Sequence, residues 1–139
     1  MRLQVVGVLC LFVTACMSLP LPGPPSDPKP ASDVMNTFAV TPRDGVGVVV
    51  VTRDRQLRDM DCTYDISLDG ELVAGLRAAE RVTIYADPGG RVVGISIRAE
   101  GKCDPAIAQV PVQVVASATT KIRVKAEARY HLKVEATTF

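Results

Sequence analysis

The groups that could carry out chemistry in this chain are few, and His131 is its only histidine. His131 lies in a stretch where charged and apolar residues alternate, which predicts an exposed position. A histidine that acts as a general acid or base needs a partner and a shielded site. Ser67 and Ser96 fall in predicted strands and lack the nucleophile-elbow pattern. These residues therefore predict no catalytic site.

Acidic residues cluster between positions 59 and 69, where a cation could be held. They lack the ligand order and the closing glutamate of a calcium-binding EF-hand loop. The cluster is therefore interpreted as solvated turns and strand edges, with no metal site and no cofactor. Its members are Asp59, Asp61, Asp65 and Asp69.

The N-terminus has the pattern of an export signal. Met1 and Arg2 form a short positive region, and an apolar run follows from residue 3 to residue 15. A membrane-spanning helix needs about 20 apolar residues, so this run is too short to span. It fits the apolar region of a secretory signal peptide. Residues 1–15 are therefore predicted to be removed.

The end of this run resembles the lipobox of bacterial lipoproteins. The residues are Val13, Thr14, Ala15 and Cys16. The resemblance implies cleavage between Ala15 and Cys16, and a lipid such as palmitate on Cys16. Residue 17 is methionine. In such lipoproteins an aspartate at this position tends to retain the protein in the inner membrane, so its absence indicates the outer membrane. The alternative is an ordinary signal peptide with a chance cysteine.

Two cysteines, Cys62 and Cys103, remain after Cys10 leaves with the signal and Cys16 takes the lipid. An even pair in an exported chain predicts a disulfide. The bond would close a loop of 41 residues, worth about 4 kcal/mol in the chain-entropy model. The alternative is two free thiols.

A proline-rich segment follows the cysteine and holds seven of the ten prolines between residues 17 and 45. Proline lacks the backbone N–H that sheets and helices use, so the segment is expected to join neither. Residues 16–45 are interpreted as a tether, whose first half would reach roughly 50 Å when extended.

The remaining residues, 46–139, predict one small antiparallel β-sandwich, an all-β fold. Short β-branched runs alternate with turn signals, among them Asp69-Gly70 and Asp87-Pro88. The run 48–51 predicts a central strand, and Arg53 after it is interpreted as a charge that guards against aggregation. Seven strands are expected, near 46–53, 61–68, 71–75, 81–86, 91–100, 110–116 and 120–136.

The last segment alternates without exception, with apolar residues at even positions and polar residues at odd ones. One face should therefore pack and the other meet water. A single strand of this length is unusual, so a bend or a break is expected near residues 126–128. The polar face carries a candidate basic surface for an envelope protein or an anionic lipid. The alternative is that neighbouring acids, such as Glu71 or Glu100, pair with it. Its basic residues are Lys121, Arg123, Lys125, Arg129 and Lys133.

The order of these motifs resembles a group of bacterial lipoproteins that share a domain of unknown function and, more distantly, the PEGA-type small β-sandwich. The resemblance covers about residues 38–136. It implies a fold and supplies no catalytic residues. The motifs are Phe38-x-x-x-Pro42-x-x-Gly45, Ile66-x-Leu68-Asp69-Gly70, Ala74-Gly75-Leu76, Asp87-Pro88-Gly89 and Tyr130-x-Leu132-x-Val134.

The sequence therefore predicts a lipoprotein of the cell envelope, in the outer membrane and facing the periplasm. Its expected role is a non-enzymatic interaction or envelope-assembly module. The formal net charge of +1 argues against a nucleic-acid partner. One alternative is a secretion-apparatus or phage-encoded lipoprotein that docks to or blocks a membrane complex. Another is a small envelope hydrolase, which would need a pocket that joins Asp61, Asp65 and His131.

Overall fold

The computed structural model describes residues 27–56, 59–128 and 131–138, which form ten strands. Signal residues 1–15, the Ala15–Cys16 cleavage site and Arg129 lie outside the described residues. In the part that is described, no helix is long and apolar enough to cross a membrane. The strands are β1 (Lys29–Pro30), β2 (Asp33–Val34), β3 (Gly47–Arg53), β4 (Tyr64–Leu68), β5 (Glu71–Leu76), β6 (Glu80–Ala86), β7 (Gly89–Ile97), β8 (Ile107–Val114), β9 (Thr119–Ala128) and β10 (His131–Thr138).

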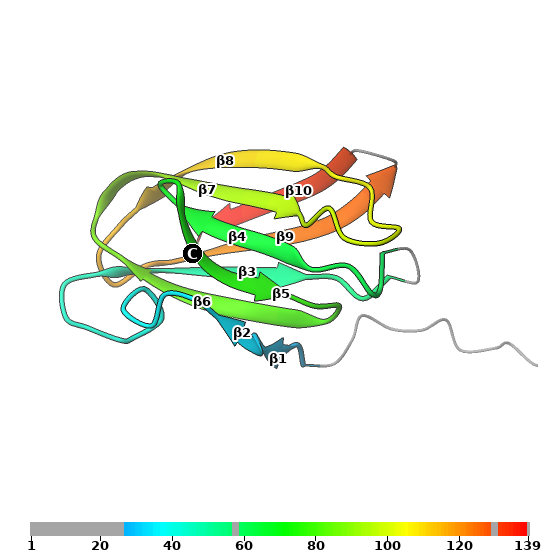
Figure 1. The fold of residues 1–139 in the computed structure, drawn as a ribbon. Coiled ribbons are helices and arrows are strands. Elements are labelled where there is room, and N and C mark those ends of the chain that lie inside the picture. The colour runs from blue at the N-terminus through cyan, green and yellow to red at the C-terminus, as the bar shows by residue number, and fades with distance from the viewer. Residues whose placement is uncertain (1–26, 57–58, 129–130, 139) are drawn as a thin grey trace, which may run out of the picture.

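The strands form two five-stranded sheets that pack face to face, which confirms the predicted all-β sandwich (Figure 1). The first sheet has the order β1-β6-β3-β9-β10, and the second has the order β2-β5-β4-β7-β8. The short strands β1 and β2 lie along one side of the sandwich, and β8 and β10 lie along the other. Most pairs are antiparallel, but β3 runs parallel to β9 and β1 runs parallel to β6.

The core lies between the sheets and is built mainly from alternate residues of the longer strands, although β5 buries the consecutive residues 73–76. In β3, Val49 and Val51 are fully buried, whereas Val48 and Val50 are half-buried. This strand lies between β6 and β9, the central position predicted for the valine run. Because strand side chains alternate between faces, every second residue enters the core. The largest side chains with almost no exposure are Tyr64, Ile66, Leu76, Ile84, Ile95 and Ile122.

The C-terminal segment is a hairpin of β9 and β10. The break expected near residues 126–128 falls at the end of β9, but the chain then reverses instead of continuing in the same direction. Val134 lies opposite Val124, and Ala136 lies opposite Ile122. A reversal between residues 128 and 131, with a register shift next to His131, pairs even residues with even residues. The alternation therefore continues through both arms, which is why the pattern alone resembles one strand. In β9 the even residues 122, 124 and 126 are buried and the odd ones mostly exposed, as predicted.

The proline-rich segment joins the sandwich at residues 29–34, which contradicts the prediction that it pairs with no sheet. The missing N–H of Pro30 does not prevent pairing, because its two neighbours donate. The Lys29 N–H donates to the Ala79 carbonyl at 2.9 Å, and the Ala31 N–H donates to the Arg81 carbonyl at 2.8 Å. An edge strand tolerates proline in this way.

The end of the sandwich where the chain enters is held by the predicted disulfide and by Arg53. Cys62 and Cys103 are bonded, with 5.7 Å between their Cα atoms. Arg53 is only 2% exposed, so it does not act as a surface guard charge. Its guanidinium donates to the carbonyls of Asp59, Cys62 and Leu76. It also stacks on the Tyr64 ring, 3.8 Å from the centroid. Burial lowers the pKa of Arg53 below its ordinary value.

Candidate functional site

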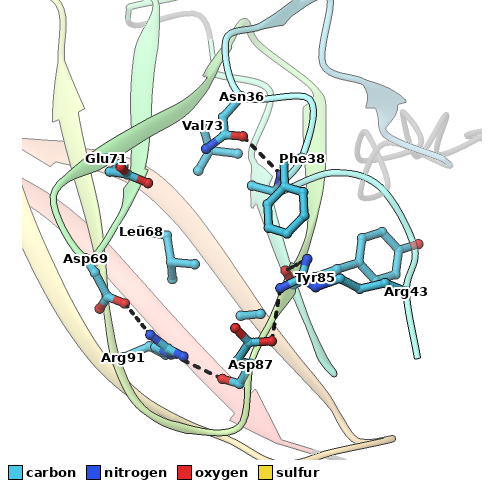
Figure 2. Close-up of a pocket in the computed structure, with 12 residues that line it drawn as sticks. Asn36, Phe38, Arg43, Leu68, Asp69, Glu71, Val73, Tyr85, Asp87 and Arg91 are labelled. Atoms are coloured by element: carbon cyan, nitrogen blue, oxygen red, sulfur yellow. Dashed lines mark hydrogen bonds and ion pairs between the residues drawn. The ribbon is translucent and has the colours of Figure 1, made fainter. Parts of the chain in front are cut away.

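A cavity of about 320 Å³ opens at the end of the sandwich opposite the disulfide (Figure 2). Three connections meet there: the loop that precedes β3, the β4–β5 turn and the β6–β7 turn. Figure 2 shows the side chains of these connections converging from separate elements. The lining residues are Asn36, Phe38, Ala39, Arg43, Leu68, Asp69, Glu71, Val73, Tyr85, Ala86, Asp87 and Arg91.

Two of the connections are the turns that the sequence predicts. Asp69 and Gly70 have φ angles of 49° and 88°, the left-handed conformation that a type I′ hairpin requires. The β6–β7 connection contains Pro88, and Gly89 follows with φ of 130°. The local sequence therefore determines where Asp69 and Asp87 project at this end.

Arg43 and Phe38 form one wall of the cavity. The Arg43 Nη1 donates to the Tyr85 carbonyl at 2.9 Å, and Nη2 contacts Asp87 Oδ1 at 3.3 Å. The same guanidinium lies over the Phe38 ring, 4.5 Å from its centroid. Phe38 is nonetheless 68% exposed. An exposed aromatic ring is thus held in place by an arginine that is itself fixed to β6.

Arg91 and Asp69 form the opposite wall. Arg91 Nη1 donates to Asp69 Oδ2 at 3.0 Å, and its Nε donates to the Asp87 carbonyl at 3.1 Å. The other Asp69 oxygen accepts the Val92 N–H at 2.9 Å. This backbone hydrogen bond and the nearby Arg91 charge lower the pKa of Asp69 below its ordinary value. Asp69 is therefore a fixed anion at neutral pH.

The cavity combines paired charges, one exposed carboxylate and an apolar ring. Asp69 and Asp87 each face an arginine, whereas Glu71 is exposed and has no ion pair within the described part of the chain. The lining contains no Ser, Cys or His, the residues most often used as nucleophiles or general bases.

The residues that a hydrolase would need are not brought together. Asp65 lies on β4 and pairs with Arg98 at 2.6 Å. Asp61 lines a second cavity, beside the disulfide, whose lining includes neither Asp65 nor His131. His131 begins β10 in the other sheet and is exposed. No group of three His, Cys, Asp or Glu side chains within residues 27–56, 59–128 and 131–138 is placed to hold a metal ion.

Acidic residues lie among the basic residues of the candidate surface. They are Asp54 and Glu135, whereas the sequence suggested Glu71 or Glu100. Arg123 donates to Asp54 at 2.6 Å, and this hydrogen bond raises the pKa of Arg123. Lys133 lies 3.4 Å from Glu135 on its own strand. Lys125 lies opposite Lys133 in the β9–β10 register, and Lys121 also has an interaction partner.

Sequence reasoning missed the end cavity because Phe38 and Arg43 belong to the segment that was assigned to the tether. A signal was present in the motif Phe38-x-x-x-Pro42-x-x-Gly45, which precedes β3. Ala39, within this motif, is buried, and its carbonyl accepts the Tyr85 N–H at 2.8 Å. The motif therefore folds against β6 and carries its aromatic ring to the cavity.

No family model matches the sequence, and the search of curated proteins finds no match.

Proposed function

We propose that this protein is a lipid-anchored, non-enzymatic interaction module of the bacterial cell envelope, in the outer membrane and facing the periplasm. The sequence from Val13 to Cys16 supports the anchor, because it resembles a lipobox at the end of a short apolar run. The bond between Cys62 and Cys103 supports export, because disulfides persist in oxidising compartments such as the periplasm.

The observation that carries the proposal is the placement of the chain entry relative to the end cavity. Lys29 pairs with Glu80 at the start of β6, whereas the cavity is lined by Tyr85 and Ala86 at the end of that strand. The 13 steps of chain from Cys16 to Lys29 would reach about 40 Å when extended. A tether of this reach presents the cavity to partners without covering it.

The cavity wall has the properties of a protein-binding anchor. Aromatic residues and arginine dominate the energetic centres of protein interfaces. Phe38 is exposed, and its contact with Arg43 limits the entropy lost when a partner covers it. The exposed carboxylate of Glu71 adds a preference for a basic side chain beside an apolar one. The proposed partner is therefore an envelope protein with a basic and apolar segment.

The anchor is tested by radiolabelled palmitate in cells that express the full chain. Cys16→Ala should abolish labelling. Cys10→Ala, six residues earlier in the same apolar run, should leave it unchanged. Persistent labelling of the Cys16 variant would contradict the anchor.

The interaction surface is tested by photo-cross-linking from a benzophenone side chain at position 38. A discrete adduct is expected from this position. The same probe at the exposed Lys102, at the other end of the sandwich, should give none. Identical adduct patterns from the two positions would remove the cavity from the proposal.

A further inference from the structure

The edge strand β10 has one side without a strand partner in the part of the chain that is described. It ends the first sheet and pairs with β9 alone. The neighbouring edge of the second sheet, β8, contains Pro111, which has no N–H to offer an added strand. Residues 131–138 contain no proline, so β10 keeps the donors that an added strand needs.

The core-facing side of β10 is also incompletely covered. Ile122, Val124 and Ala126 on β9 are buried. Their partners across the ladder become progressively more open: Leu132 and Val134 are half-buried, and Ala136 is exposed. A further strand beside β10 would cover these apolar side chains and satisfy its free backbone groups.

We propose that the occupant of this edge is a second copy of the chain, paired antiparallel through β10 with Val134 opposite its own copy. In this register, Lys133 of each copy faces Glu135 of the other, and Leu132 faces Ala136. Opposite charges directly across a ladder stabilise strand pairing, and like charges oppose it. The strand therefore carries a charge pattern that is complementary to itself.

Neighbouring registers lose this complementarity. A shift of two residues in one direction places Lys133 against Lys133, and a shift in the other direction places Glu135 against Glu135. A shift of one residue places the apolar face of one copy against the charged face of the other. Among these registers, only the one centred on Val134 pairs opposite charges on one face of the strand and apolar residues on the other.

The pairing is compatible with two copies in one membrane. Antiparallel β10 strands give a two-fold axis, so the chain entries lie at opposite ends of the joined sheets. The length of β9, ten residues, corresponds to about 33 Å. Tethers of about 40 Å can reach the same surface from both ends. The pairing does not depend on lipidation, so its test is separate from that of the anchor.

The register is tested by disulfide cross-linking of the full chain with Val134→Cys. Facing residues of an antiparallel ladder have Cα atoms about 4.5–5.5 Å apart, within the range that a disulfide spans. Mild oxidation of the detergent-solubilised protein should give a covalent dimer on a non-reducing gel. The chain with native Val134 should give none under the same conditions.

Charge substitutions in the Val134→Cys background then test the proposed pairing. Lys133→Glu creates two like-charge contacts and should lower the dimer yield about tenfold. The double change Lys133→Glu with Glu135→Lys restores both contacts and should recover the dimer. Lys102→Glu makes the same change of charge far from β10 and should have no effect.

Loss of folding does not mimic this result, because Lys133 lies opposite Lys125 within the protein. The Lys133→Glu change replaces that repulsion with an attraction and gives up the solvent-exposed contact with Glu135, so the two effects offset and the melting temperature should change little. Absence of the Val134→Cys dimer would overturn the proposal. An unchanged yield with Lys133→Glu, or no recovery in the double variant, would overturn it as well.

Discussion

Arg53 offers the sharpest test of how this sandwich is held together, through the substitution Arg53→Met. Methionine keeps most of the length and the apolar stem of the side chain, so it leaves only a small cavity. It removes the donors to the carbonyls of Cys62, Leu76 and Asp59. It also removes the guanidinium from the Tyr64 ring. The change therefore isolates the polar role of a buried residue.

The expected loss follows from these contacts. The bonds to Cys62 and Leu76 are buried, and each acceptor left without a donor costs about 1–3 kcal/mol. The contact with Asp59 is half-buried, so water replaces part of it. A desolvated cation–π contact contributes about 2 kcal/mol. Relief of the cost of burying the charge offsets part of this sum. We expect a net loss of about 4 kcal/mol in the free energy of unfolding.

The measurement is urea unfolding of the purified chain at neutral pH without reductant, so that the disulfide stays intact. The matched control is Arg123→Met, which removes a guanidinium whose side chain is 53% exposed and bound to Asp54. Exposed ion pairs contribute about 0–1 kcal/mol, so this variant should unfold near the wild-type midpoint. An Arg53→Met loss no larger than that of the control would refute the role assigned to the buried guanidinium.

Two further predictions concern close packing and pH. A Cβ at Gly94 would overlap the Ser67 Oγ, which would have to rotate away, so Gly94→Ala should cost about 1 kcal/mol of stability in thermal melts. Adding Ser67→Ala should recover most of that loss, and no recovery would contradict the packing argument. The folded-state pKa of Asp69 lies below its ordinary value of 3.8, so Asp69 adds stability that is present above about pH 4 and lost as pH falls through the lower, folded-state pKa. Asp69→Asn, which tolerates the same turn, should flatten the fall of stability below pH 4; unfolding curves with equal acid dependence would exclude this role.

The sequence predicted the sandwich because its strongest signals are local. Alternation identifies which residues of β3 and β9 are buried, and Asp69-Gly70 identifies a hairpin turn. Pairing between distant strands leaves no such local trace. The parallel pairing of β3 with β9 joins residues about 70 positions apart, and nothing in either strand specifies its partner. The β9–β10 reversal was missed for a related reason, since the register shift next to His131 pairs even residues with even residues and so leaves the alternation intact.

Arg53 and the end cavity were missed for a different reason. Alternation places Arg53 on the inner face, in phase with Val49 and Val51, but its charge favoured an exposed interpretation. The groups that make its burial tolerable are backbone carbonyls of other segments, which no side-chain pattern reveals. The same holds for Phe38 and Arg43, since their position depends on contacts with β6 rather than on neighbouring residues.

At both ends of the sandwich, arginine side chains donate hydrogen bonds to backbone carbonyls. This limits which groups a partner could contact there. Strand ladders satisfy the carbonyls along the sheets, but those at turns and strand ends need other donors. Arg53 supplies them at the disulfide end, and Arg43 and Arg91 supply them at the cavity end. The chain has no tryptophan and only three tyrosines, so few other large side chains could donate hydrogen bonds to these carbonyls. These arginines therefore use donors within the fold and have fewer left for a partner. A partner at the end cavity would be recognised by what they leave open, namely the Phe38 ring and the Glu71 carboxylate.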